Sequence, residues 1–213
     1  LIVDRLLAGR YRPWALVGAY GDNLDETAAA LAETSGLDAE EAALLRELGH
    51  LLNYNGYGSS EADLHVHPAD LYREVHRFVD PSEFALQSDL LAGLRAGHDR
   101  DMARAEALTP RWSFSAGQVY LLPAASWARR VVGVFANRVA RREPDLAHAT
   151  LITNTDGSLL VSVRAPLDNP RGADSLCRQF ATGGGRAAAA GINRLPADAL
   201  DRFLAVFAAH FAV

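Results

Sequence analysis

The chain has 213 residues, of which 49% are hydrophobic and 22% are charged, and it carries a net charge of −5. This composition is typical of a globular protein with a buried core, and the negative balance argues against broad attraction to long nucleic acid or anionic membrane. No apolar stretch has the length of a membrane span, and the single cysteine, Cys177, excludes an internal disulfide, so we expect a cytoplasmic protein that does not bind membranes.

The first part of the chain predicts helices around one strand. The sequence opens at Leu1 inside an amphipathic helical pattern, which we interpret as a fragment of a longer protein. The apolar run 14–20, followed by Gly21-Asp22-Asn23, predicts a buried parallel strand that ends in a polar loop. Helices are predicted at 24–35, 38–52 and 68–79, with a loop rich in Asn and Gly at 53–63.

A charged helical stretch at 82–108 follows and ends at Thr109-Pro110. Beyond it, hydrophobic alternation and turn residues predict strands at 118–122, 149–154 and 159–165, and helices at 126–142, 173–180 and 196–211. We therefore predict an α/β fold in three parts: a lobe of one strand plus helices at 1–79, a helical linker at 80–112, and an α/β domain at 113–213.

Three consecutive glycines, Gly183, Gly184 and Gly185, are the strongest local signal for chemistry, and Arg186 follows them. Successive glycines let backbone N–H groups turn toward one point, where they can bind an anion, and an adjacent guanidinium adds positive charge. The alternative interpretation is a tight turn in which small residues allow close packing.

Strand 159–165 carries a second signal. Alternation places Ser162 and Arg164 on one face of the strand, where a hydroxyl and a guanidinium can hold phosphate oxygens. A strand face exposed to solvent is the alternative interpretation of this pair.

The Ser-x-Arg strand, the short helix and the glycine run with Ala189-Ala190-Gly191 together resemble the DHH-associated C-terminal domain of DHH-family phosphoesterases. In that family the strand and the glycine loop grip the substrate phosphate, so the resemblance implies the same role here. The family usually has His where this chain has Arg186. Arginine binds phosphate but cannot shuttle a proton near neutral pH.

The resemblance extends to residues 14–23, which are similar to the last metal-binding motif of the DHH catalytic domain. It implies that Asp22 is a ligand of Mn²⁺; the alternative is that Asp22 caps the following helix. Residues 52–58 are similar to a loop that faces the substrate in relatives, which makes Asn55 and Gly58 candidate contacts, and a structural turn is the alternative. The residues after this loop, 59–64, resemble a bacterial subgroup with exopolyphosphatase-related labels.

The resemblance implies a metal-dependent phosphohydrolase with a two-metal Mn²⁺ centre. Its implied substrates are a small nucleotide, a short single-stranded oligonucleotide or polyphosphate, and a homodimer is compatible with it. The chain has neither an Asp-His-His triplet nor an Asp-x-Asp motif near its start, so we expect the remaining ligands upstream of Leu1. Because cleavage by this mechanism requires both cations, we expect the chain alone to be inactive. The alternative function is a non-catalytic module that binds a nucleotide or phosphate.

Overall fold

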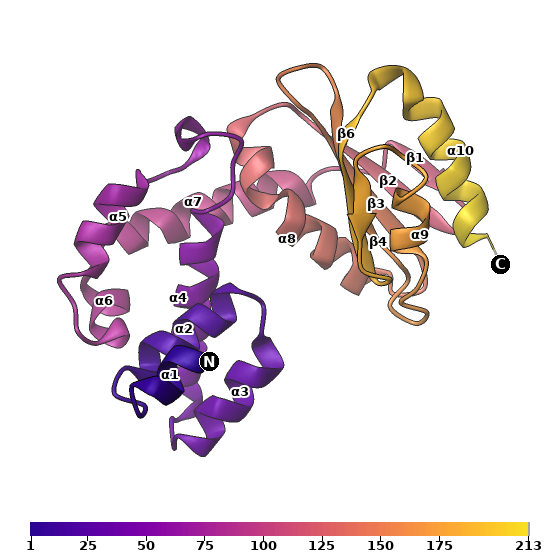
Figure 1. Ribbon diagram of the computed structural model, residues 1–213. Coiled ribbons are helices and arrows are strands. Elements are labelled where there is room, and N and C mark those ends of the chain that lie inside the picture. The colour runs from indigo at the N-terminus through magenta and orange to yellow at the C-terminus, as the bar shows by residue number, and fades with distance from the viewer. Residues whose placement is uncertain (213) are drawn as a thin grey trace. The chain divides into compact units, whose positions relative to one another are not determined.

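The computed structural model describes residues 1–212, which form two units with separate hydrophobic cores, Leu1–Arg100 and a second unit that begins at Asp101 (Figure 1). The first unit is helical and the second is built on a six-stranded sheet, so the predicted α/β class is confirmed. In the part of the chain that the structure describes, no helix is long and apolar enough to cross a membrane.

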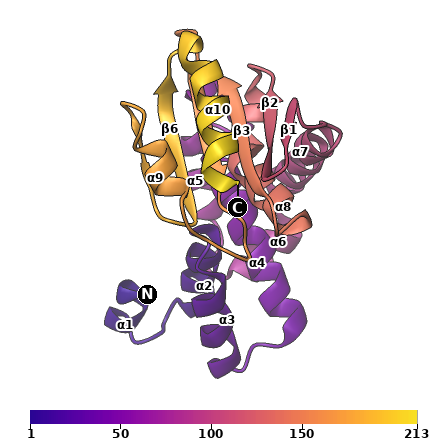
Figure 2. The same cartoon turned by 90° about the vertical axis from the view of Figure 1, so that its right-hand side faces the viewer.

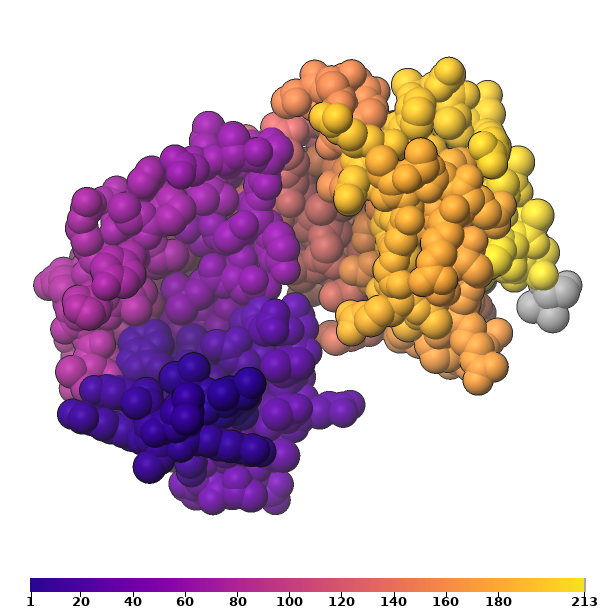
Figure 3. All heavy atoms as spheres, in the orientation of Figure 1, coloured from indigo at the N-terminus to yellow at the C-terminus, as the bar shows by residue number. Residues whose placement is uncertain are grey.

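All the regular secondary structure of the first unit is helical. The helices are α1 (Ile2–Leu6), α2 (Arg12–Gly21), α3 (Asp25–Thr34), α4 (Ala39–Tyr54), the short 3-10 helix η1 (Glu61–Asp63), α5 (Pro68–Val75), α6 (Pro81–Gln87) and α7 (Asp89–Glu106), which continues into the second unit. Helix α1 lies on the surface of its unit, where Ile2 and Leu6 are each 78% exposed (Figure 3).

The strand predicted at 14–20 is wrong, because these residues lie in helix α2. Pro13 is the second residue of this helix, where its missing N–H has no partner within the helix to lose. The apolar run is continuous because Leu16, Val17, Ala19 and Tyr20 are all buried in the core of the first unit. A short apolar run of this kind fits a buried helix as well as a buried strand.

The segment that the sequence assigns to a linker contributes to the first core. Phe84 on α6 and Leu91 and Leu94 on α7 are fully buried there. The structure has two units. The three-part division at 1–79, 80–112 and 113–213 stays a prediction.

The second unit contains β1 (Trp112–Phe114), β2 (Gly117–Leu122), α8 (Ser126–Arg142), β3 (Ala147–Thr153), β4 (Leu159–Arg164), α9 (Ala173–Cys177), β5 (Gly183–Gly185), β6 (Ala189–Leu195), the 3-10 helix η2 (Ala197–Ala199) and α10 (Leu200–Phe211). The strand order is β1-β2-β3-β4-β6-β5. Strands β2 and β3 are parallel and joined through α8, as a parallel pair requires, and all other pairs are antiparallel.

Helices cover the two faces of this sheet unequally. Helices α9 and α10 pack on one face over the main core, which includes Leu176, Phe203 and Phe207 (Figure 2). Helix α8 packs on the other face over β3 and β4, where Phe135 meets Tyr120 edge to face. Strands β6 and β5 extend beyond β4 to the end of the sheet, and α9 is the helix that packs on them.

Candidate functional site

Two rows of residues cross the α8 side of the sheet and bring most of the predicted phosphate-binding residues together. In one row, Ser162 on β4 lies opposite Gly191 on β6, which lies opposite Gly184 on β5. Directly opposed residues point to the same face, so Gly184 and Gly191 leave that face bare of side chains beside Ser162.

The second row carries the two guanidinium groups. Arg164 lies opposite Ala189, and Ala189 exchanges backbone hydrogen bonds of 3.1 and 2.9 Å with Arg186. These pairings put Arg164 and Arg186 on the same face, with one methyl group between them. Adjacent strands are about 4.8 Å apart, so the two backbones are separated by about 10 Å and the long side chains flank the bare glycine surface.

Arg164 is held by neutral acceptors. Its Nε donates to Oδ1 of Asn137 over 2.7 Å, and its Nη1 donates to Oγ of Ser162 over 2.8 Å and to the carbonyl oxygen of Val163 over 3.1 Å. The predicted shared face of Ser162 and Arg164 is thereby confirmed. A guanidinium has five N–H donors, and among residues 1–212 no group accepts from Nη2 of Arg164, so both of its donors are available to a ligand.

The charge of Arg164 is not balanced within the described residues 1–212, where no carboxylate forms an ion pair with it. Burial lowers the pKa of this guanidinium, and the nearby positive charge of Arg186 lowers it further. An arginine remains charged in spite of such shifts. The arrangement is therefore a half-buried cation whose surroundings favour an anion.

The glycine run is an edge strand and not the predicted loop or turn. Gly183 and Gly185 face away from the bare surface, and each has a packing reason. A Cβ on Gly183 would overlap the backbone carbonyl of Cys177, and Gly185 has a φ of +144°, a conformation that favours glycine. Gly184 has no such reason, because a Cβ added there would meet nothing within 4 Å. Its lack of a side chain keeps the surface next to Ser162 and Arg164 open.

Three polar residues that the sequence did not predict lie beside this surface. Asn137 on α8 holds Arg164, while His148 and Thr150 on β3 lie opposite Arg164 and Ser162 and are fully buried. Among residues 1–212, the Nδ1 of His148 and the Oγ1 of Thr150 have no hydrogen-bond partner. Burial lowers the pKa of His148, so its ring adds no charge near neutral pH. For His148 and Thr150, the signal that could have revealed them is the alternation of polar residues with Ala147, Ala149 and Leu151 along β3.

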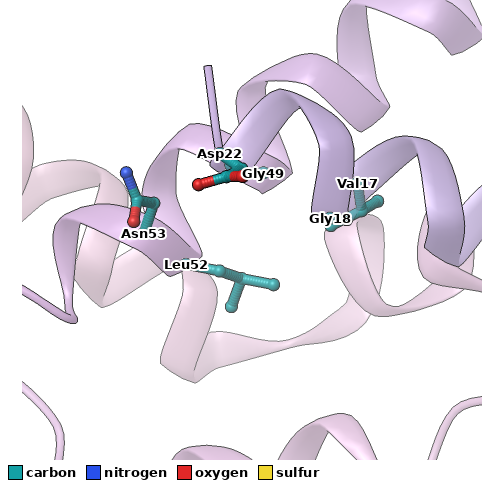
Figure 4. Close-up of a pocket in the computed structure, with 7 residues that line it drawn as sticks. Val17, Gly18, Asp22, Gly49, Leu52 and Asn53 are labelled. Carbon is teal, nitrogen blue, oxygen red and sulfur yellow. The ribbon is translucent and has the colours of Figure 1, made fainter. Parts of the chain in front are cut away.

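Asp22 lies in the first unit, at the end of α2. It lines a pocket of about 290 Å³ together with Gly18, Gly49, Leu52 and Asn53, among others. Figure 4 shows the carboxylate of Asp22 and the amide of Asn53 on the same side of this pocket. Asp22 does not cap the next helix, because the N-cap position of α3 is Leu24.

The described residues do not fit a metal ion at Asp22. A hard cation requires several oxygen ligands, and among the residues that the structure describes Asp22 is the only carboxylate that lines the pocket. Across residues 1–212 no group of three His, Cys, Asp or Glu side chains is placed to hold a metal. The role of Asp22 as a metal ligand therefore stays a prediction.

Asn55 and Gly58, the candidate substrate contacts, lie in the loop after α4. Asn55 is 3% exposed, and its amide both donates to and accepts from the backbone of Val66, over 2.9 and 3.1 Å. Gly58 is exposed, and a Cβ there would come within 2.8 Å of Asp63. These contacts support the structural alternative for Asn55, and its contact with substrate stays a prediction.

The glycines of the Asp22 pocket provide a matched pair of substitutions. Gly49→Ala is expected to destabilise the first unit by about 2 kcal/mol, because its Cβ would overlap the backbone of α2 at Val17 where α2 and α4 cross. Gly18→Ala is expected to raise stability by about 1 kcal/mol, because Gly18 lies in a helix with open space beside it. Urea unfolding of both variants checks this, and equal effects would contradict the close packing of α2 on α4.

Comparison with known proteins gives matches in structure alone. No protein-family model matches the sequence, and no curated protein matches it. One solved structure, the DHH domain of a member of the s1p family of ribosomal proteins, aligns with 94% of this chain at a TM-score of 0.55 and 13% identity. The chain spans about half of that structure, 49% of its length.

A second structure is the pGpG-specific phosphodiesterase PggH from Vibrio cholerae, with a TM-score of 0.53 and 12% identity. The alignment covers 86% of this chain and 72% of PggH. The exonuclease RecJ bound to manganese aligns with 84% of this chain and 57% of its own length at 19% identity, but its TM-score of 0.45 is too low to support an argument. At these identities the likeness concerns the fold, and on that ground this chain has the fold of the DHH-domain proteins.

Proposed function

We propose that this chain is the phosphate-binding part of a phosphohydrolase, which cleaves a phosphoester or phosphoanhydride in a small nucleotide, a short oligonucleotide or polyphosphate. One observation carries the proposal: Arg164 is half-buried, held in place by neutral acceptors, and has no carboxylate partner among residues 1–212. The fold that the chain shares with a phosphodiesterase, PggH, supports the choice of reaction class.

Phosphate fits this surface by charge and by shape. The free Nη2 of Arg164 and the guanidinium of Arg186 supply donors to phosphate oxygens, and charge-assisted bonds of this kind are about twice as strong as neutral ones. Gly184 and Gly191 let the phosphate lie close to the sheet because neither has a side chain. In this proposal Ser162 orients Arg164 and offers its hydroxyl at the edge of the same surface.

Metal-dependent cleavage is proposed for the complete protein and not for residues 1–213 alone. We propose Mn²⁺ as the cation and Asp22 as one ligand, with the remaining ligands supplied from outside the described residues. The isolated chain is then expected to bind phosphate compounds without hydrolysing them.

A non-catalytic binding module is the second candidate function. It is favoured by Arg186, because neither this residue nor Ser162 or Arg164 can act as a general acid or base near neutral pH. In this alternative the complete protein binds a nucleotide and releases no product, whichever divalent metal ion is added.

Hydrolysis assays separate the two functions. The complete protein with Mn²⁺ is expected to release product from a panel that includes a dinucleotide, a nucleoside monophosphate and polyphosphate, and EDTA is expected to stop the reaction. The isolated chain is expected to bind the same compounds without turnover. Binding without turnover by the complete protein would support the module, and turnover by the isolated chain would contradict the division of roles proposed here.

A further inference from the structure

Within residues 1–212, one side chain from outside its own strand holds Arg164 in place, Asn137 of helix α8. The Nε of Arg164 donates to Oδ1 of Asn137 over 2.7 Å, the shortest of the three hydrogen bonds that the guanidinium makes. The other two bonds involve Nη1 and come from β4 itself, at Ser162 and Val163. Asn137 therefore decides where the free Nη2 points, because a planar guanidinium fixed at Nε and Nη1 cannot turn.

The amide at position 137 contrasts with the acids that pair with two arginines of α8, Arg130 and Arg138. Arg130 on this helix pairs with the carboxylate of Asp101 over 2.7 Å, and Arg138, which follows Asn137 directly, pairs with Glu106. These pairs join a guanidinium to an acid that neutralises it. Arg164 receives a neutral amide oxygen, which satisfies the Nε–H and leaves the positive charge in place.

An aspartate at 137 would satisfy Nε equally well in shape. Asp and Asn have the same number of heavy atoms, and a carboxylate accepts from a guanidinium more strongly than an amide does. The carboxylate would also balance the charge of Arg164 and oppose a phosphate bound at Nη2. Stability alone would therefore favour Asp at this position, and anion binding favours Asn.

We propose that Asn137 is a positioning residue of the phosphate site, which orients Arg164 while leaving its charge available to the substrate. The inference rests on the proposed function, since it assigns Asn137 a role in the same site. It is distinct from a structural role for Asn137, because the two roles predict opposite rankings of substitutions. If Asn137 only supports the fold, Asp is tolerated better than Ala in every measurement.

The test compares Asn137→Asp and Asn137→Ala in the chain 1–213, with inorganic phosphate as the probe and calorimetry as the measurement. Asn137→Asp is expected to weaken phosphate binding by about tenfold or more, with an unchanged or higher Tm. Asn137→Ala is expected to weaken binding less, because Arg164 loses its orientation and keeps its charge. Gln179→Glu, at an exposed residue just after α9 on the opposite face of the sheet, controls for the added negative charge and is expected to bind as the wild type does.

The outcomes separate this inference from the function on which it rests. If Arg164→Ala abolishes binding and Asn137→Asp binds phosphate as tightly as the wild type, the role of Asn137 is overturned and the proposed site stands. If Asn137→Asp binds more tightly than Asn137→Ala, Asn137 is a structural residue and the inference is again overturned. If Arg164→Ala itself binds like the wild type, the proposed phosphate site is wrong.

Discussion

Arg164→Ala is expected to lower the affinity of the chain for inorganic phosphate by about tenfold to a hundredfold, which corresponds to about 1.5–3 kcal/mol for hydrogen bonds to a charged group. The reason is that Arg164 is half-buried and its free Nη2 is aimed from a fixed position. Removing it eliminates both the charge and the donors. Calorimetric titration with phosphate measures the loss.

Two further variants make this result specific to the site. Arg164→Lys keeps a positive charge but loses the planar fork, so we expect an intermediate affinity. Arg178→Ala removes a guanidinium that is paired with Asp174 of α9, on the opposite face of the sheet, and is expected to leave phosphate affinity unchanged. Equal losses in Arg164→Ala and Arg178→Ala would mean that binding follows overall charge and not the geometry at Arg164.

Adjacent glycines of β5 are expected to respond in opposite ways to substitution by alanine. Gly183→Ala is expected to reduce the free energy of unfolding of the second unit by about 3 kcal/mol, because its Cβ would overlap the carbonyl oxygen of Cys177. The carbonyl of Cys177 belongs to the backbone and a Cβ is attached directly to it, so neither group can move without shifting the chain. Urea or thermal unfolding measures the effect.

Gly184→Ala is the matched control for stability and a probe of binding. Its Cβ would meet no atom within 4 Å, so stability is expected to stay the same or to rise by about 0.5–1 kcal/mol. The new methyl group would stand on the open surface beside Gly191 and is expected to weaken phosphate binding. Unchanged phosphate affinity in Gly184→Ala would show that the ligand does not lie over β5.

Much of the second unit follows from its sequence. Residues alternate along β4, so that Val161 and Val163 face the core and Ser162 and Arg164 face polar groups. The turn at 155–158 joins β3 and β4 into a hairpin. Helix α8 begins and ends where its amphipathic pattern does, at Ser126 and Arg142. These features are local, so a single sequence contains them.

Two of the local errors come from patterns that fit more than one structure. Residues 14–20 are apolar throughout, and this fits a buried strand or a helix that is buried on most sides, as α2 is. Three glycines predict a loop by propensity, but tertiary contacts place Gly183 against Cys177 and pair the run with β6. In both cases the packing partner, and not the segment itself, decides the structure.

The site could be predicted only as far as its residues share a strand or a motif. Ser162 and Arg164 follow from alternation, whereas Asn137 is 27 residues away from Arg164 and meets it through tertiary packing. Gly184 lies opposite Gly191, and Arg186 lies opposite Ala189. These pairings depend on the register of β5 on β6, which no local sequence pattern determines.

The most direct test of the phosphate surface is an NMR titration of the ¹⁵N-labelled chain with inorganic phosphate. The Nε–H signal of Arg164 and the backbone amides of Gly184, Gly185 and Arg186 are expected to shift together along one binding curve. Phosphate that shifts other signals and leaves Arg164 and Gly184 unchanged would contradict the proposed site.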